Sequence, residues 1–198
     1  MIHYLSNCIA HIFVLYGEST EEDADIYTYA IEAVLAVLFN LALCLIISFL
    51  FGRILEGLLF ISAFALLRRF TGGYHADTHY KCILTFSILL TCAMLITYFL
   101  SGVYASSFIA LIIATMAWLG IFALAPIDDK NRHYKGEMQM KLKKKSIAVS
   151  TCLFAFCAIA GFALNTDVAL MLSLSMFSVF GSMVYAKCDH SHHKQSLL

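Results

Sequence analysis

The chain has 198 residues; 61% of them are hydrophobic, only 13% are charged, and the formal net charge at pH 7 is zero. A soluble domain carries about a quarter charged residues, so this composition excludes a soluble globular protein. We expect a lipid bilayer, and no nucleic acid, as the partner of its surface.

The opening segment, residues 1–29, combines an apolar face with an acidic stretch. Leu5, Ile9, Ile12 and Tyr16 recur at the spacing of one helix face, which predicts an amphipathic helix at a membrane surface. The segment contains no Lys or Arg, and no small-residue cleavage site follows the apolar run, so it is unlike a signal peptide.

Six apolar segments follow, at roughly 31–51, 54–67, 82–100, 103–125, 147–164 and 168–186. Lipid cannot satisfy free backbone groups, so segments of this kind cross a bilayer as helices of about 20 residues. We therefore predict an all-α polytopic membrane protein that forms a single domain over residues 1–198. The second segment is short and contains Glu56, so a span, a re-entrant segment and a buried helix all stay open.

Basic residues predict which segment ends share one side of the membrane. Twelve of the 13 Lys and Arg residues lie in the loop after the second segment, in a loop at 126–146 and in the tail at 187–198. These three regions alternate so that they fall on the same side, which the positive-inside rule assigns to the cytoplasm. The N-terminus lies on that side too if the second segment crosses.

A small polar island at 68–82 reads Arg-Arg-Phe-Thr-Gly-Gly-Tyr-His-Ala-Asp-Thr-His-Tyr-Lys-Cys. Of the cysteines at the start or inside of an apolar segment, Cys82 is the one with such polar neighbours, and Cys188 lies in the His-rich tail. A thiol nucleophile needs a lowered pKa and a base within hydrogen-bond reach. Cys82 and His75 are therefore a candidate nucleophile and base, and the alternative is a cysteine that only packs at a helix start.

The spacing of His75 and Cys82 restricts how they can meet. On one straight helix, seven residues separate two side chains by about 10 Å, whereas proton transfer needs contact at about 3 Å. The pair therefore requires a bend, for which Gly72 and Gly73 supply backbone freedom, or a contact across a helix pair or a protomer interface.

Two further interpretations stay open at this stage. His75, His79 and Cys82 could share a helix face and bind zinc, but the sequence has no His-Glu-x-x-His signature and no obvious fourth ligand nearby, so we expect no metal and no cofactor. Glu56 is a charged residue in an apolar run, and it either pairs with Arg53 or orients His75 as a third catalytic residue.

The polar island resembles the motif of the AgrB family, integral-membrane cysteine endopeptidases of bacterial peptide signalling. The shared pattern is an Arg, a glycine-rich turn, His75-Ala76, and Cys82 seven residues after the His. A second similarity begins at residue 125, with Ala-Pro-Ile-Asp-Asp-Lys-Asn-Arg followed by a basic run. The resemblance implies that Cys82 is the nucleophile and His75 its partner, in a homodimer of the bacterial cell membrane with the motif at the cytoplasmic side. The supporting positions of the same motif would be Arg68, Arg69, Gly72 and Gly73.

The resemblance implies cleavage of an AgrD-type precursor peptide with an acidic C-terminal tail. Cys82 would release the tail and hold the remaining segment as a thioester, and an internal thiol or hydroxyl would then close a thiolactone or lactone ring for quorum sensing. The basic residues Lys141, Lys143, Lys144 and Lys145 would attract the acidic tail, or alternatively hold the loop on anionic lipid. The competing functions are a small non-enzymatic membrane transporter or accessory subunit, and a zinc-dependent membrane peptidase.

Overall fold

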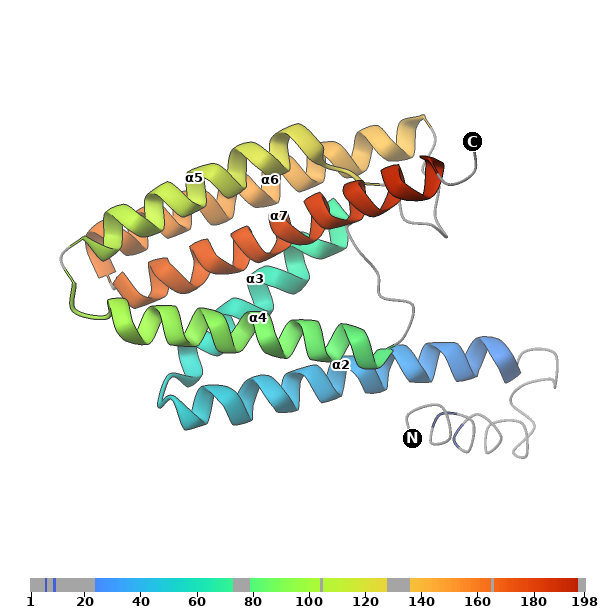
Figure 1. Cartoon of the computed structure of the whole chain (residues 1–198), viewed down its shortest axis with the longest axis horizontal. Helices are drawn as coiled ribbons and strands as arrows, with labels where there is room; N and C mark the ends of the chain where they lie inside the picture. The colour runs from blue at the N-terminus through green and yellow to red at the C-terminus, as the bar shows by residue number, and fades with distance from the viewer. Residues whose placement is uncertain are drawn as a thin grey trace.

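The computed structural model describes Ser6, Ile9 and residues 24–72, 79–103, 105–127, 136–164 and 166–195. The six main helices are α2 (Ala24–Leu50), α3 (Ile54–Thr71), α4 (His79–Leu100), α5 (Ser106–Leu124), α6 (Glu137–Ile159) and α7 (Thr166–Gln195), and a π-helical turn, η2 (Ala160–Leu164), precedes α7 (Figure 1). Each predicted apolar segment lies on one of these helices, which confirms the all-α class. Most of the predicted amphipathic helix at the N-terminus lies outside the described residues.

Five of the helices are long and apolar enough to cross a membrane, namely α2, α4, α5, α6 and α7. Exposed aromatic residues mark both ends of the apolar surface, with Tyr29 and Phe49 on α2 and Tyr80 and Phe99 on α4. At 1.5 Å per residue, about 30 Å separates the two members of each pair, which is the thickness of the hydrocarbon core. Tyr is enriched at membrane–water interfaces, so the exposed Tyr29 and Tyr80 indicate where one bilayer boundary lies.

Successive helices run in opposite directions, so their connections lie at two ends of the bundle (Figure 1). We call one of them the basic end: α3 and α7 finish there, α4 and α6 begin there, and it carries most of the Lys and Arg residues. At the other, the turn end, α2 is followed by α3, α4 by α5, and η2 by α7. The three basic regions therefore share one end of the bundle, as the sequence predicted, and α2 starts at that end.

Helix α3 resolves the ambiguity of the short second segment. It is continuous from Ile54 to Thr71 and joins the turn end to the basic end, which excludes a re-entrant segment. It contains Glu56 in its first turn and Arg68 and Arg69 in its last. These charges are tolerated because α3 packs against α2, α4, α6 and α7.

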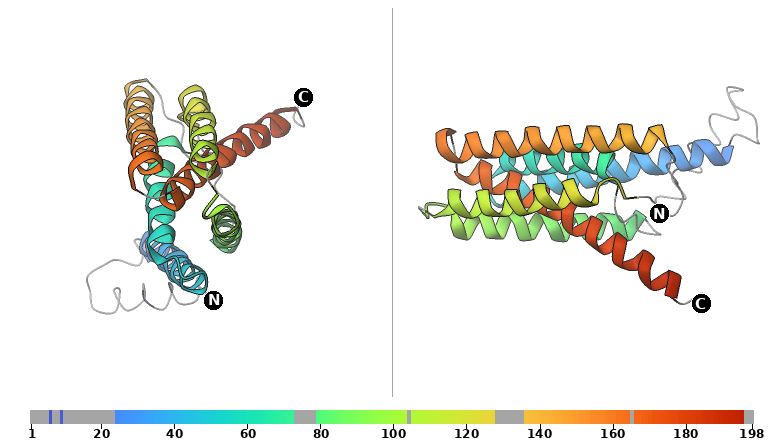
Figure 2. Two further views of the ribbon diagram at one scale, coloured as in Figure 1. Left: turned by 90° about the vertical axis from the view of Figure 1, so that its left-hand side faces the viewer. Right: turned by 90° about the horizontal axis from the view of Figure 1, so that it is seen from above.

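Two predicted boundaries differ from the structure. Helix α6 begins at Glu137, so the lysines expected in a loop lie on its first turns, and α7 continues to Gln195, into the predicted tail. Hydropathy detects only the part of a helix that lies in the membrane, whereas polar turns of good helix formers extend beyond it. Figure 2 shows that the second half of α7 diverges from the other helices.

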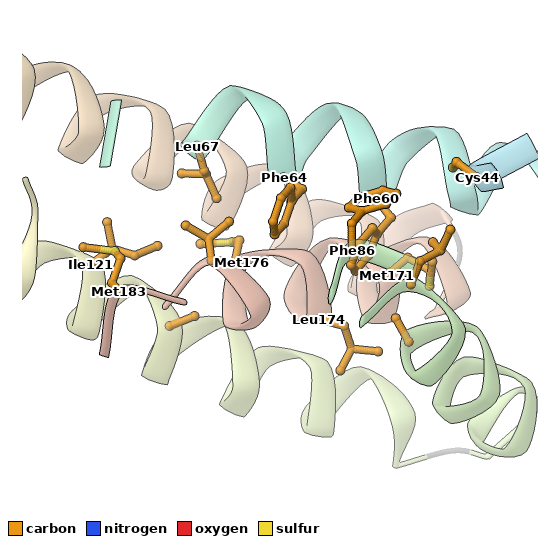
Figure 3. Close-up of a cluster of buried hydrophobic side chains, with 14 of the residues drawn as sticks. Cys44, Phe60, Phe64, Leu67, Phe86, Ile121, Met171, Leu174, Met176 and Met183 are labelled. Atoms are coloured by element: carbon orange, nitrogen blue, oxygen red, sulfur yellow. The ribbon is translucent and has the colours of Figure 1, made fainter. Parts of the chain in front are cut away.

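The core surrounds the first half of α7, where residues 168–176 are all buried. Ser175 donates a hydrogen bond of 3.1 Å to the carbonyl oxygen of Phe60 on α3, which satisfies a hydroxyl inside an apolar core. Phe60 and Phe64 of α3 pack with Phe86 of α4, beside Met171 and Met176 of α7 (Figure 3). This contact fixes the relative height of α3 and α4, on which the geometry of the site depends.

Candidate functional site

Cys82 lies in the first turns of α4, as the fourth residue of the helix, at the basic end. It is half-buried, and Tyr80, two residues before it, is 72% exposed at the membrane boundary. The buried cysteines behave differently, because the thiols of Cys44 and Cys157 donate to backbone carbonyl oxygens at 3.3 Å. Cys82 is therefore more accessible than those two cysteines, which are buried in the packing of the helices.

The position of Arg68 relative to Cys82 follows from the aromatic contact below them. The rings of Phe64 and Phe86 lie 5.6 Å apart and join α3 to α4. Arg68 is one turn beyond Phe64, with its Cζ 5.6 Å from that ring, and Cys82 is one turn before Phe86. Because α3 and α4 run in opposite directions, the turn from Phe64 to Arg68 and the turn from Phe86 back to Cys82 both lead toward the basic end. Arg68 and Cys82 therefore lie at the same level of the bundle.

The two adjacent arginines differ in orientation, and the sequence alone could not show this difference. Arg68 points inward and its Nη1 lies 3.5 Å from the Ser182 hydroxyl of α7. Arg69 is exposed, with its Cζ 5.9 Å from the ring of Phe70. Only Arg68 therefore directs its positive charge into the bundle, toward α7.

The predicted basic residues of α6 lie on the surface beside the end of α3. Lys141, Lys143, Lys144 and Lys145 are all exposed. Lys141 is 3.6 Å from Glu137 on the same helix, and the Nζ of Lys145 lies 5.9 Å from the ring of Phe70. The lysine-rich turns are thus held next to residues 68–72, the first part of the motif.

The two segments that carry the sequence resemblance touch each other. The backbone N–H of Ile127 donates a 3.0 Å hydrogen bond to the carbonyl oxygen of Thr71, and Gly72 and Ile127 form an isolated parallel bridge. We did not predict Ile127 as a site residue. The only signal for it in the sequence was its place in the Ala-Pro-Ile run.

His75 and Gly73 lie outside the described residues, so the distance between the predicted base and Cys82 is not part of the structure. No group of three or more His, Cys, Asp and Glu that could hold a metal occurs among the residues that are described.

Glu56 lies at the turn end, where its carboxylate is 3.8 Å from the guanidinium of Arg53. The structure thus shows the pairing of Glu56 with Arg53, about 24 Å along α3 from Gly72, after which the described part of this segment ends.

The fold and the site define an all-α polytopic membrane protein with a cysteine and an arginine at one membrane boundary. The chain matches the family model described as AgrB: Accessory gene regulator B over residues 6–185, and it belongs to that family. It is 25% identical to "Putative AgrB-like protein 2" of Clostridium perfringens (strain 13 / Type A), over 91% of this chain and 87% of the relative. It is 26% identical, with the same coverage, to "Putative AgrB-like protein" of C. perfringens (strain SM101 / Type A). No solved structure matches the chain significantly.

Proposed function

We propose that this protein is a membrane cysteine endopeptidase that removes the C-terminal tail from an AgrD-like precursor peptide and promotes cyclisation of the remainder. The observation that supports this most directly is the position of Cys82. It is half-buried at the start of a membrane helix, at the level of Arg68 and next to the boundary marked by Tyr80. A thiol there meets a substrate held at the membrane surface while access of bulk water is limited.

The reaction proceeds in two balanced steps. The Cys82 sulfur attacks the carbonyl carbon before the tail while His75 accepts the thiol proton; the C–N bond breaks, and the departing amine takes that proton. The precursor then remains as an acyl thioester on Cys82. A thiol or hydroxyl inside the bound segment attacks this thioester, the C–S bond breaks, and the cysteine regains its proton as the ring closes. The thioester keeps the acyl group activated, so cyclisation needs no ATP.

Arg68 contributes a fixed positive charge to the same steps. It lies at the level of Cys82 and is held by the Phe64 ring and the Ser182 hydroxyl. A thiolate and a tetrahedral oxyanion are both negatively charged, and a preorganised cation stabilises such charge more strongly away from bulk water. In this proposal Arg68 supports the charge that forms in the reaction, whereas the exposed Arg69 contributes little.

The lysines of α6 are proposed to bind the acidic tail of the precursor. They are exposed beside the end of α3, and Lys145 contacts Phe70 of the motif, so a peptide held by them is close to residues 68–72. Binding to anionic lipid is the competing role. The precursor KM of lysine variants, measured in neutral-lipid vesicles, distinguishes tail binding from lipid binding. Without anionic lipid, the KM depends on the lysines only if they bind the tail.

The location follows from the charges at the basic end. We propose that this end faces the cytoplasm of a bacterial cell membrane and that the protein acts as a homodimer, the state implied by the family. Labelling of an engineered single cysteine at residue 143 from either side of inverted vesicles tests the first statement. Native mass spectrometry from detergent micelles tests the second.

The experiment that tests the function uses the full chain in proteoliposomes with a synthetic AgrD-like precursor. Cys82→Ala should abolish cleavage, whereas Cys92→Ala, on the same helix but exposed among apolar residues, should leave it unchanged. A transporter or an accessory subunit would show no cleavage with either protein. A zinc peptidase would be inhibited by chelators and resist thiol reagents. Cleavage that survives Cys82→Ala contradicts the proposal.

A further inference from the structure

The end of α3 is held by the backbone of a distant segment, residues 125–127, which directly follows α5. Ile127 donates its N–H to the carbonyl oxygen of Thr71 at 3.0 Å, and it pairs with Gly72 as a parallel bridge. Thr71 is fully buried, and its hydroxyl donates to the carbonyl oxygen of Leu67 at 3.1 Å. Ala125, at the end of α5, is buried as well. The last turn of α3 is therefore held by two hydrogen bonds at Thr71. One is made within the helix, to Leu67, and the other comes from Ile127 in the segment after α5.

Gly72 is the residue that makes this contact sterically possible. Its φ is +70°, a conformation that favours glycine, and a Cβ added to it would overlap the carbonyl oxygen of Ile127. Gly102 has a similar φ of +80°, but a Cβ added there would meet nothing within 4 Å. Gly72 is thus required for a close backbone approach as well as for its dihedral angle.

A second contact ties the same turn to the next helix. Lys145 of α6 places its Nζ 5.9 Å from the ring of Phe70. The end of α3 therefore contacts Ile127, which follows α5, and Lys145, which lies on α6. Both contacts fall on residues 70–72, directly before the part of the motif that contains His75.

We propose that residues 125–127 form a positioning strut, which sets the direction in which the chain leaves α3 and thereby aligns His75 with Cys82. This inference rests on the proposed function. His75 is only three residues beyond Gly72, and Cys82 is held separately on α4 by the packing of Phe86. A change of direction at Gly72 therefore moves the base relative to the thiol. Misplacement of a catalytic group by about 1 Å lowers a rate on the order of 100-fold.

Two variants break the strut from opposite sides. Ile127→Pro removes the N–H donor, and Gly72→Ala inserts a Cβ against the Ile127 carbonyl. We expect both to lower kcat for precursor cleavage on the order of 10- to 100-fold while KM stays unchanged, because the substrate still binds but the base is misaligned. Ile127→Val keeps the donor, and Gly102→Ala places a side chain at another positive φ without the contact, so both controls should retain the wild-type kcat.

Three measurements separate the possible outcomes. Thermal unfolding in detergent reports the folded fraction, and a loss of activity equal to the loss of folded protein overturns the strut. A folded Ile127→Pro protein with wild-type kcat overturns it too. If the proline variant does not fold, an ester linkage at residue 127, made with the α-hydroxy analogue of isoleucine, replaces the N–H donor by an oxygen and keeps the side chain, and its kcat decides the question. Cleavage by Cys82→Ala, measured in parallel, would instead contradict the proposed function.

Discussion

The two ends of the bundle are built from opposite kinds of contact. At the turn end, the guanidinium of Arg53 binds the carboxylate of Asp167 at 2.5 Å and the hydroxyl of Ser101 at 2.9 Å. Ser101 also donates to Asp167 at 3.0 Å, so one compact network joins the α2–α3 and α4–α5 connections to the first turn of α7. At the basic end, exposed lysines of α6 lie beside Phe70 of α3, Lys81 directly precedes Cys82, and the connections are longer.

This difference suggests that the turn end serves mainly stability and the basic end mainly the reaction. Short, internally paired connections hold helices in place, whereas longer connections on a rigid scaffold provide room for binding and catalysis. Like charges at the basic end repel each other, and such an arrangement is useful when an anionic partner is to bind. We therefore expect changes at the basic end to affect turnover first, and changes at the turn end to affect stability first.

The largest effect is expected from the inward-facing arginine. Arg68→Ala should lower kcat for precursor cleavage on the order of 100-fold, as loss of a preorganised group that stabilises developing negative charge does. Arg69→Ala is the matched control and should lower kcat little, because Arg69 is exposed. Single-turnover cleavage in proteoliposomes measures both. Equal losses in the two variants would show that the inward orientation of Arg68 is irrelevant to turnover.

The next effect concerns the turn end and should appear in stability. Arg53→Ala leaves Asp167, whose side chain is only 15% exposed, without its arginine. We expect a loss of roughly 2 kcal/mol in unfolding free energy, below the value for a fully buried pair because both partners keep some solvent. Denaturant unfolding in mixed micelles measures it. Turnover per folded molecule should stay normal, and a selective loss of turnover would erase the distinction between the two ends.

A smaller loss of stability is expected where α2 crosses α3. A Cβ at Gly57 would overlap the side chain of Ser48, so Gly57→Ala should destabilise the protein by about 1 kcal/mol. Gly181 on α7 has nothing within 4 Å of an added Cβ, and Gly181→Ala should be neutral or slightly stabilising. A stable Gly57→Ala protein would indicate that the two helices pack less tightly than the structure shows.

The smallest effect is expected from single lysines of α6. Lys143→Ala or Lys144→Ala should raise precursor KM a few-fold at low salt and less at high salt, since exposed charges are screened by ions. Lys187→Ala provides a control at the same end of the bundle. A KM that is insensitive to both lysines and salt, in neutral-lipid vesicles, would favour the lipid-binding role for these residues.

The sequence predicted the helices and their common basic end because hydropathy and charge are properties of local segments. It also contained the helix phase that turns Arg68 inward, since Phe60, Phe64 and Arg68 recur every four residues, but the adjacent Arg69 obscured this signal. The start of α6 was placed too late, because its lysine-rich first turns are polar and yet helical.

The contact between Ile127 and Gly72 could not be predicted in the same way. It joins residues far apart in the sequence through backbone atoms, which leave no pattern in side-chain type. The only local trace was a glycine at position 72, and a glycine with positive φ is equally consistent with an ordinary turn such as the one at Gly102. The contact between Glu56 and Arg53 was one of two alternatives that the sequence left open for Glu56.

The most direct test of the account is the intact mass of the full-length protein after it is mixed with precursor and quenched in acid. We predict an added mass equal to the precursor without its tail, removed by hydroxylamine, located on the peptide that contains Cys82, and absent from Cys82→Ala. Tail release without any covalent adduct, or an adduct on another cysteine, would contradict a thioester mechanism at this residue.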